Sequence, residues 1–97
     1  MTHKITLKNG FKLTIDEDIV QDYDFMEAYR KMRNVDGIFT DDETLEGYMQ
    51  LVDIVFGKQK NALFAQIRKE NGKLGMIPFE LCDDAITKLN ALMNGKN

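Results

Sequence analysis

The sequence predicts an α+β fold in which an N-terminal β-hairpin packs on a bundle of about four α-helices. Apolar residues alternate with polar ones up to residue 15, and from residue 22 onward they recur with the spacing of amphipathic helices. The chain has 97 residues, of which 43% are apolar and 30% charged, which is typical of one small folded domain. We therefore expect a single domain over residues 1–97, with the hairpin in residues 1–15 and the helical part in residues 22–95.

The register of the hairpin follows from its turn. A two-residue turn at Asn9-Gly10 would place charged and apolar side chains on the same face. A three-residue loop over residues 8–10 instead pairs Leu7 with Phe11 and Ile5 with Leu13, and it leaves Gly10 for the left-handed position that such a loop requires. This second register gives one continuous apolar face. Helices must cover that face, because an isolated hairpin is marginal in water.

Residues 16–24 form an acidic connection to the first helix. Asp24, with Glu27 three residues later, is expected to cap this helix, which should end near Asn34. Its apolar stripe is Phe25, Ala28, Tyr29 and Met32.

A second helix is predicted from about Asp41 to just before Gly57. Thr40 and Glu43 have the spacing of a capping box at its start, and glycine is a common helix terminator. The apolar stripe that follows the helical period comprises Leu45, Tyr48, Met49, Val52, Val55 and Phe56.

A further set of three residues, Gly47, Leu51 and Ile54, lies on nearly the opposite side of this second helix. Two interpretations are open. Either the helix is central and both faces are core, or this second stripe is exposed and contacts another chain. Gly47, Leu51 and Ile54 are accordingly the candidate partner-binding residues.

Two more helices complete the chain. The third should run from Lys58 to about Lys69 and end at Asn71-Gly72, and the fourth should begin at Pro78 and end at Gly95. The third buries Leu63, Phe64 and Ile67, and the stripe of the fourth is Phe79, Cys82, Ala85, Ile86, Leu89, Leu92 and Met93.

The segment from Met32 to Glu43 partly matches a calcium-binding loop. Asp36, Gly37 and Glu43 fall at its fifth, sixth and twelfth positions, but Met32 stands at the first, where calcium needs an oxygen ligand. Helix ends and a turn account for the same residues. We therefore expect a connection between helices and no metal site.

Catalytic chemistry is not indicated. The chain contains no serine, and Cys82, which could be paired with His3 as nucleophile and base, lies in an apolar stripe typical of a structural cysteine. No spacing suggests a zinc site. The expectation is a protein that is not an enzyme and that has no cofactor.

Charge and hydropathy limit the classes of partner that the protein is expected to bind. The net charge is −3, and the only local basic cluster is Arg30, Lys31 and Arg33, so nucleic acid is not an expected partner. No apolar run approaches the roughly 18 residues of a membrane span, and the first ten residues do not resemble a signal sequence. We expect a cytosolic protein.

The acidic clusters at residues 16–24 and 41–46 leave a second function open. The protein could be a small regulator or inhibitor that binds a basic bacterial protein.

Several stretches resemble a known family. "DFMEAYRKM" (residues 24–32), "VFGKQKNALFAQI" (55–67), "ENGKLGMIPFEL" (70–81) and a final apolar helix resemble the tail assembly chaperones of long, non-contractile-tailed bacteriophages or prophages. Phe56, Gly57 and Gln59 fill one signature of that family, and Asn71 with Gly72 fills another. The similarity extends from about residue 22 to residue 93.

The resemblance implies a non-enzymatic role in the cytoplasm of the bacterial host during tail morphogenesis. The implied partners are the tape-measure protein, whose helical segments the chaperone keeps soluble, and the major tail protein, with self-association as a further possibility. Such a role requires a small folded domain with an apolar surface that holds another helix.

Overall fold

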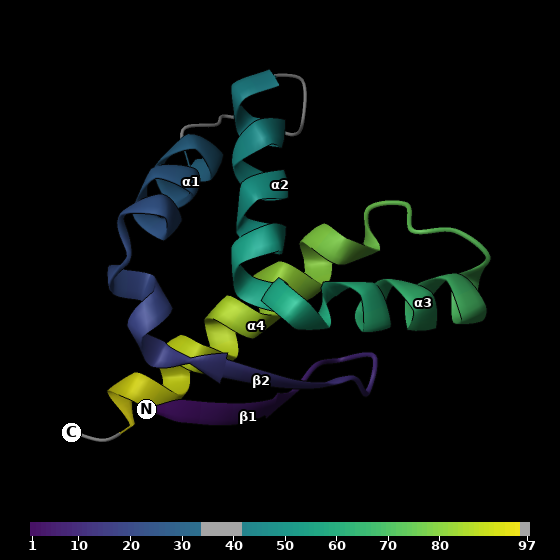
Figure 1. The fold of residues 1–97 in the computed structure, drawn as a ribbon, viewed down its shortest axis with the longest axis horizontal. Coiled ribbons are helices and arrows are strands. Elements are labelled where there is room, and N and C mark those ends of the chain that lie inside the picture. Colours follow the sequence, from purple (N-terminus) through teal and green to yellow (C-terminus); the bar gives the residue numbers. More distant parts are fainter. Residues whose placement is uncertain (34–41, 96–97) are drawn as a thin grey trace.

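The computed structural model describes residues 1–33 and 42–95, and it has the expected α+β architecture (Figure 1). An antiparallel hairpin precedes four helices that pack on each other. The elements are β1 (Thr2–Thr6), β2 (Lys12–Asp16), a 3-10 helix η1 (Glu17–Gln21), α1 (Tyr23–Arg33), α2 (Asp42–Phe56), a 3-10 turn η2 (Gly57–Gln59), α3 (Lys60–Asn71) and α4 (Ile77–Asn94).

The hairpin has the register that the three-residue loop predicts. Ile5 pairs with Leu13, and the Leu7 backbone N–H donates to the Phe11 carbonyl at 2.8 Å. Gly10 has a φ of +89°, the left-handed conformation that glycine adopts without strain. The register prediction is therefore confirmed.

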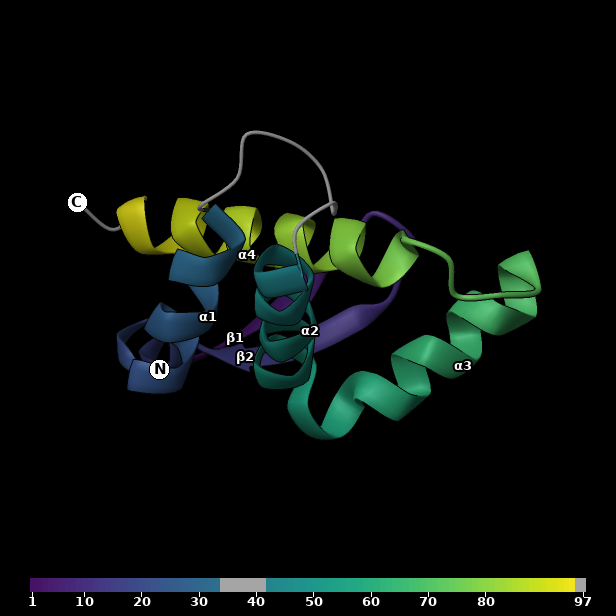
Figure 2. The same cartoon turned by 90° about the horizontal axis from the view of Figure 1, so that it is seen from above.

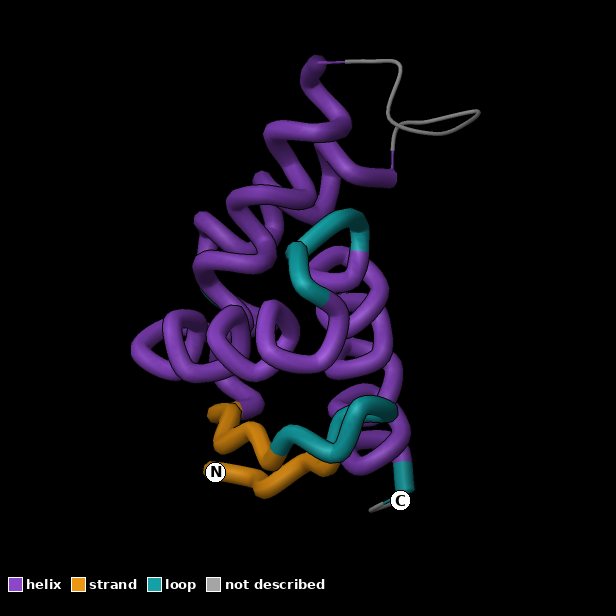
Figure 3. The backbone as a smooth tube through the Cα atoms, turned by 90° about the vertical axis from the view of Figure 1, so that its right-hand side faces the viewer, coloured by secondary structure: helices purple, strands orange, loops and turns teal. Residues whose placement is uncertain are grey.

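One face of the hairpin is buried under helices. Ile5, Leu7, Leu13 and Ile15 point to this face, and each is at most 4% exposed. β1 contacts α4 and β2 contacts α2, and Figures 1 and 3 show the hairpin at one end of the molecule, level with the C-terminal end of α4. The helices supply the apolar cover that a two-stranded sheet requires.

Side chains from the helices also satisfy the outward-facing backbone of both strands. On β2, the Gln59 side chain bridges both polar groups of Thr14: its amide donates to the Thr14 carbonyl at 2.7 Å, and its oxygen accepts from the Thr14 N–H at 2.9 Å. Beside β1, Lys88 donates to the Thr6 carbonyl at 2.7 Å, and Asp84 accepts from the Lys8 N–H at 2.9 Å. These bonds fix the hairpin to the helices.

Replacing Gln59 tests the importance of this edge bridge. Gln59→Ala removes two partly exposed hydrogen bonds, so we expect the free energy of unfolding to fall by about 1–2 kcal/mol. Urea denaturation followed by circular dichroism measures this change. Gln50→Ala is the control, because its bond within the described residues is to Glu46 on its own helix. Equal stability of the two variants would contradict a role for the bridge.

The first helix begins one residue before the expected cap. The Asp22 carboxylate, not that of Asp24, caps α1 by accepting from the Asp24 N–H at 2.9 Å, while Glu27 bonds to Arg30. The acidic connection before it contains η1, whose first turn is capped by Asp16. The capping assignment from sequence was therefore wrong, since several acidic residues in succession offer alternative caps.

The second helix ends where it was expected to end, and it begins at Asp42, the first described residue after the gap. The predicted start at Asp41 and the capping residue Thr40 lie outside the described residues, as does Asn34 at the predicted end of the first helix. At Gly57 (φ +49°) the chain turns through η2 directly into α3, which leaves at a steep angle to α2 (Figures 1 and 2). α3 therefore begins at Lys60, two residues later than predicted.

The last two helix boundaries agree closely with expectation. α3 ends at Asn71 with Gly72 in the left-handed conformation (φ +81°), and Pro78 lies in the first turn of α4. Along α4, Cys82, Ala85, Ile86 and Leu89 are buried as predicted. Leu92 is 42% exposed, so the apolar stripe extends beyond the core. Within the described residues, no helix is both long and apolar enough to cross a bilayer.

Candidate binding groove

The candidate partner-binding residues of α2 separate into core and surface. Leu51 is 0% exposed and Gly47 is buried, whereas Ile54 is only partly buried. Gly47 lies so close to α1 that a Cβ atom there would be 2.8 Å from the Ala28 carbonyl oxygen. Gly47 and Leu51 are therefore core residues of the folded chain, which corrects their assignment to a partner surface. Ile54 alone of the three can be offered to a partner.

Ile54 lines two adjoining shallow hollows that carboxylates border. We call the two together the Ile54 hollow. One, of about 380 Å³, is lined by Ile54, Ile19, Asp16, Asp18, Asp22 and Asp24. The other, of about 280 Å³, is lined by Ile54, Asp24, Glu27, Lys31, Gln50 and Asp53. The surface around Ile54 is consequently apolar at its centre and anionic at its edge.

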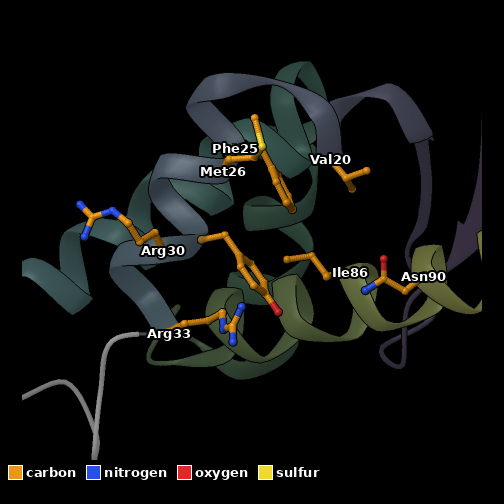
Figure 4. Close-up of a pocket in the computed structure, with 8 residues that line it drawn as sticks. Val20, Phe25, Met26, Arg30, Arg33, Ile86 and Asn90 are labelled. Atoms are coloured by element: carbon orange, nitrogen blue, oxygen red, sulfur yellow. The ribbon is translucent and has the colours of Figure 1, made fainter.

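A larger groove lies between α1 and α4, and we call it the α1–α4 groove (Figure 4). It has a volume of about 650 Å³. The lining residues come from η1, α1 and α4: Val20, Phe25, Met26, Tyr29, Arg30, Arg33, Ile86 and Asn90. Sequence reasoning did not find this groove.

The groove has an apolar floor and an exposed apolar side chain in its lining. Phe25 and Ile86 are 6% and 7% exposed, and the Phe25 ring stacks on that of Tyr29 with a centroid distance of 5.9 Å. Met26, by contrast, is 50% exposed. An unbranched methionine in such a position adapts readily to different apolar partners.

The two arginines of the groove differ in their contacts. Arg30 bonds to Glu27 at 2.8 Å and lies 3.7 Å from Glu43; the Glu27 hydrogen bond raises the pKa of Arg30 and lowers that of Glu27. The Arg33 guanidinium lies over the Tyr29 ring, 5.6 Å from its centroid. In Figure 4 Arg30 points outward, whereas Arg33 is turned toward the groove.

The single cysteine has the environment of a structural residue. Cys82 is 0% exposed, and burial, with a smaller contribution from Asp83, raises the pKa of its thiol to about 12. A thiol with this pKa is protonated at neutral pH and is a poor nucleophile. His3, its candidate base, lies instead 2.7 Å from the Glu17 carboxylate. The structure therefore favours a structural role in the core for Cys82 over a role as a nucleophile.

Next to the cysteine, a tyrosine and a carboxylate share a hydrogen bond. The Tyr48 hydroxyl donates to Asp83 at 3.3 Å and its ring packs on Phe79 at a centroid distance of 5.3 Å. Burial, with the negative charge of Asp83, raises the pKa of Tyr48 to about 12, and burial also raises the pKa of Asp83. The pair links α2 to α4 on the side of the core that Cys82 occupies.

Most of the partial calcium-loop match falls outside the described residues, which omit positions 34–41. In residues 1–33 and 42–95, no group of three or more His, Cys, Asp or Glu side chains is arranged to hold a metal ion. In the described part of the chain, the α1–α4 groove and the Ile54 hollow are candidates for a binding role.

Comparison with protein-family models, with curated proteins and with solved structures finds no match for this chain. The fold and the two surfaces define its class: a small α+β domain with a groove of apolar and basic side chains between two helices.

The sequence contained weak signals for the groove. Met26 lies beside Phe25 but outside the apolar stripe of α1, and Arg30 and Arg33 belong to the one basic cluster of the chain. The sequence did not indicate that α4 lies near α1, with Ile86 opposite that helix.

Proposed function

We propose that this protein is a tail assembly chaperone of a long, non-contractile-tailed bacteriophage or prophage. In this role it binds helical segments of the tape-measure protein, keeps them soluble and helps to recruit the major tail protein, without catalysing a reaction. The observation that carries the proposal is the α1–α4 groove, an open groove between two helices in which apolar side chains lie beside two arginines. The family resemblance supplies the biological setting.

A helical ligand is the occupant that the proposal assigns to this groove. An amphipathic helix binds a groove of this kind by placing apolar side chains, spaced three or four residues apart, against its floor. Phe25 and Ile86 form the floor, and Met26 supplies an exposed contact. A long, helix-rich partner exposes many such apolar stripes before it assembles, and covering them opposes aggregation.

The residues that carry the family resemblance support the scaffold. Phe56 is 0% exposed, Gly57 makes the turn between α2 and α3, and Gln59 bridges β2. Asn71 donates to the Ile67 carbonyl at 3.1 Å at the end of α3, and Gly72 terminates that helix. These signature residues therefore shape the fold, whereas the first resembling stretch, residues 24–32, supplies Phe25, Met26, Tyr29 and Arg30 to the groove.

Co-expression tests the proposal directly. The probe is the product of the reading frame downstream of this gene, which the proposal requires to be a long, helix-rich protein. We expect that protein to be soluble and to co-purify when it is expressed with this chain, and to be insoluble when it is expressed alone. Solubility that does not depend on this chain would contradict the chaperone function.

Two methionine variants locate the surface. Met26→Glu introduces a charge into the α1–α4 groove, so we expect it to weaken partner binding at least about tenfold with little change in stability. Met49→Glu is the matched control, because Met49 is 56% exposed on α2 and does not line the groove. Equal retention of the partner by both variants, measured by co-purification after co-expression, would place the binding surface outside the groove.

A second function, a regulator that binds a basic bacterial protein, is favoured by the Ile54 hollow. Asp18, Asp22 and Asp24 surround Ile54 and Ile19 there. Binding at this surface would weaken steeply as ionic strength rises, since exposed charges are screened by salt. Apolar docking in the α1–α4 groove would depend little on salt.

A further inference from the structure

Arg33 is the feature of the α1–α4 groove that docking of an apolar stripe does not explain. Its guanidinium lies over Tyr29, and no carboxylate pairs with it among residues 1–33 and 42–95. The other cations along α1 have such partners: Arg30 bonds to Glu27, and Lys31 lies 3.3 Å from Glu46. Arg33 therefore presents a positive charge to the groove.

The lining of the groove reinforces this contrast. The chain has 16 acidic and 13 basic residues, yet among the described residues the groove lining contains two arginines and no Asp or Glu. Carboxylates line the Ile54 hollow, on another side of α1, instead. The two candidate surfaces thus differ in the sign of charge beside their apolar centres.

Stacking on Tyr29 prepares Arg33 for an anionic ligand. The aromatic face holds the planar guanidinium by a cation–π contact, so less side-chain freedom is lost when a carboxylate binds. A guanidinium also donates two parallel hydrogen bonds to one carboxylate, which fixes the ligand's orientation. An apolar helix that carries a Glu or Asp next to its stripe satisfies both parts of the groove.

We propose that the α1–α4 groove selects acidic amphipathic helices, with apolar side chains against Phe25, Met26 and Ile86 and a carboxylate on Arg33. This inference rests on the proposed function and specifies the chemistry of the helical segment that is bound. The occupant is a helix of another protein.

Two designed helical peptides test the charge preference. They share one apolar stripe and differ only in the residues beside it, which are Glu in one peptide and Lys in the other. Titration calorimetry with the full chain is expected to show the Glu peptide binding about fivefold more tightly than the Lys peptide, the size expected for one partly exposed ion pair.

Two arginine variants assign the preference to its residue. Arg33→Gln is expected to reduce it to less than about twofold, whereas Arg68→Gln should leave it unchanged. Arg68 is a matched control: it also lies over an aromatic ring, 6.0 Å from the Phe64 centroid, but on α3, and its replacement removes the same charge.

Three outcomes of the peptide titrations would overturn the inference. If the two peptides bind with equal affinity and neither binds the Met26→Glu variant, the groove is the binding surface but it does not select by charge. If the Lys peptide binds more tightly, the anionic Ile54 hollow is the binding surface instead of the groove. If neither peptide binds, the groove does not bind an amphipathic helix. If instead the Glu peptide is preferred through Arg33 but the downstream protein stays insoluble in co-expression, this inference stands and the chaperone function fails.

Discussion

Gly47→Ala is expected to lower the free energy of unfolding by about 2–3 kcal/mol, although alanine favours helices by about 1 kcal/mol over glycine. The added Cβ would lie 2.8 Å from the Ala28 carbonyl oxygen, from the Met32 backbone nitrogen and from the Lys31 Cβ. Two of these atoms belong to the backbone of α1 and cannot move aside alone. α1 and α2 must therefore separate, which loosens the Leu51 and Ala28 packing between them.

Thermal denaturation of the variant measures this cost. In a chain of 97 residues each kcal/mol corresponds to about 4–8 °C, so we expect the midpoint to fall by about 10–20 °C. Thr87→Ala on α4 is the control, because Thr87 is exposed and its replacement changes helix propensity without a close contact. An unchanged midpoint for Gly47→Ala would mean that α1 and α2 approach less closely than described.

The hairpin was predictable from sequence because its information is local. The alternation of Ile5, Leu7, Leu13 and Ile15 with polar residues allows only one buried face, and a one-residue shift would expose all four. Gly10 then selects the loop. Similarly, Gly57 and Gly72 ended helices where expected, since the left-handed conformation they adopt is strained for other residues.

The groove was not predictable because its two walls are far apart in the chain. Helical periodicity identifies the apolar side of a helix, but it does not say which apolar residues a neighbouring helix covers. Leu51 and Ile54 belong to one stripe and are three residues apart, yet only Leu51 is completely enclosed. On α1, Phe25 and Met26 are neighbours with 6% and 50% exposure.

The placement of Arg33 depends on the same tertiary information. The sequence shows three basic residues within four positions at the end of α1. Only the folded chain distinguishes Arg30 and Lys31, which have carboxylate partners, from Arg33, which lies over Tyr29. The candidate charge selection in the groove comes from this difference in contacts.

The double variant Leu51→Glu with Ile54→Lys is expected to unfold the isolated domain, and the single changes should show that Leu51→Glu is responsible. Leu51 is 0% exposed in the core, so an ionised glutamate there would lose its hydration without gaining a partner. This penalty of several kcal/mol is comparable to the total stability of a small domain, about 5–15 kcal/mol. Circular dichroism of each purified variant measures the loss of helix.

The comparison between the two single variants separates core from surface on α2. Ile54→Lys should remain folded, since the partly exposed side chain can extend its ammonium group into water near Asp24 and Asp53, which line the same hollow. Leu92→Glu, at a position 42% exposed on α4, controls for the chemistry of the leucine-to-glutamate change. A folded Leu51→Glu variant that no longer binds its partner would restore the whole stripe as an interface. If Leu51→Glu is unfolded while Ile54→Lys and Leu92→Glu are folded, Gly47 and Leu51 are core residues whose burial stabilises the fold. Ile54 is then the one residue of the stripe that can contact a partner.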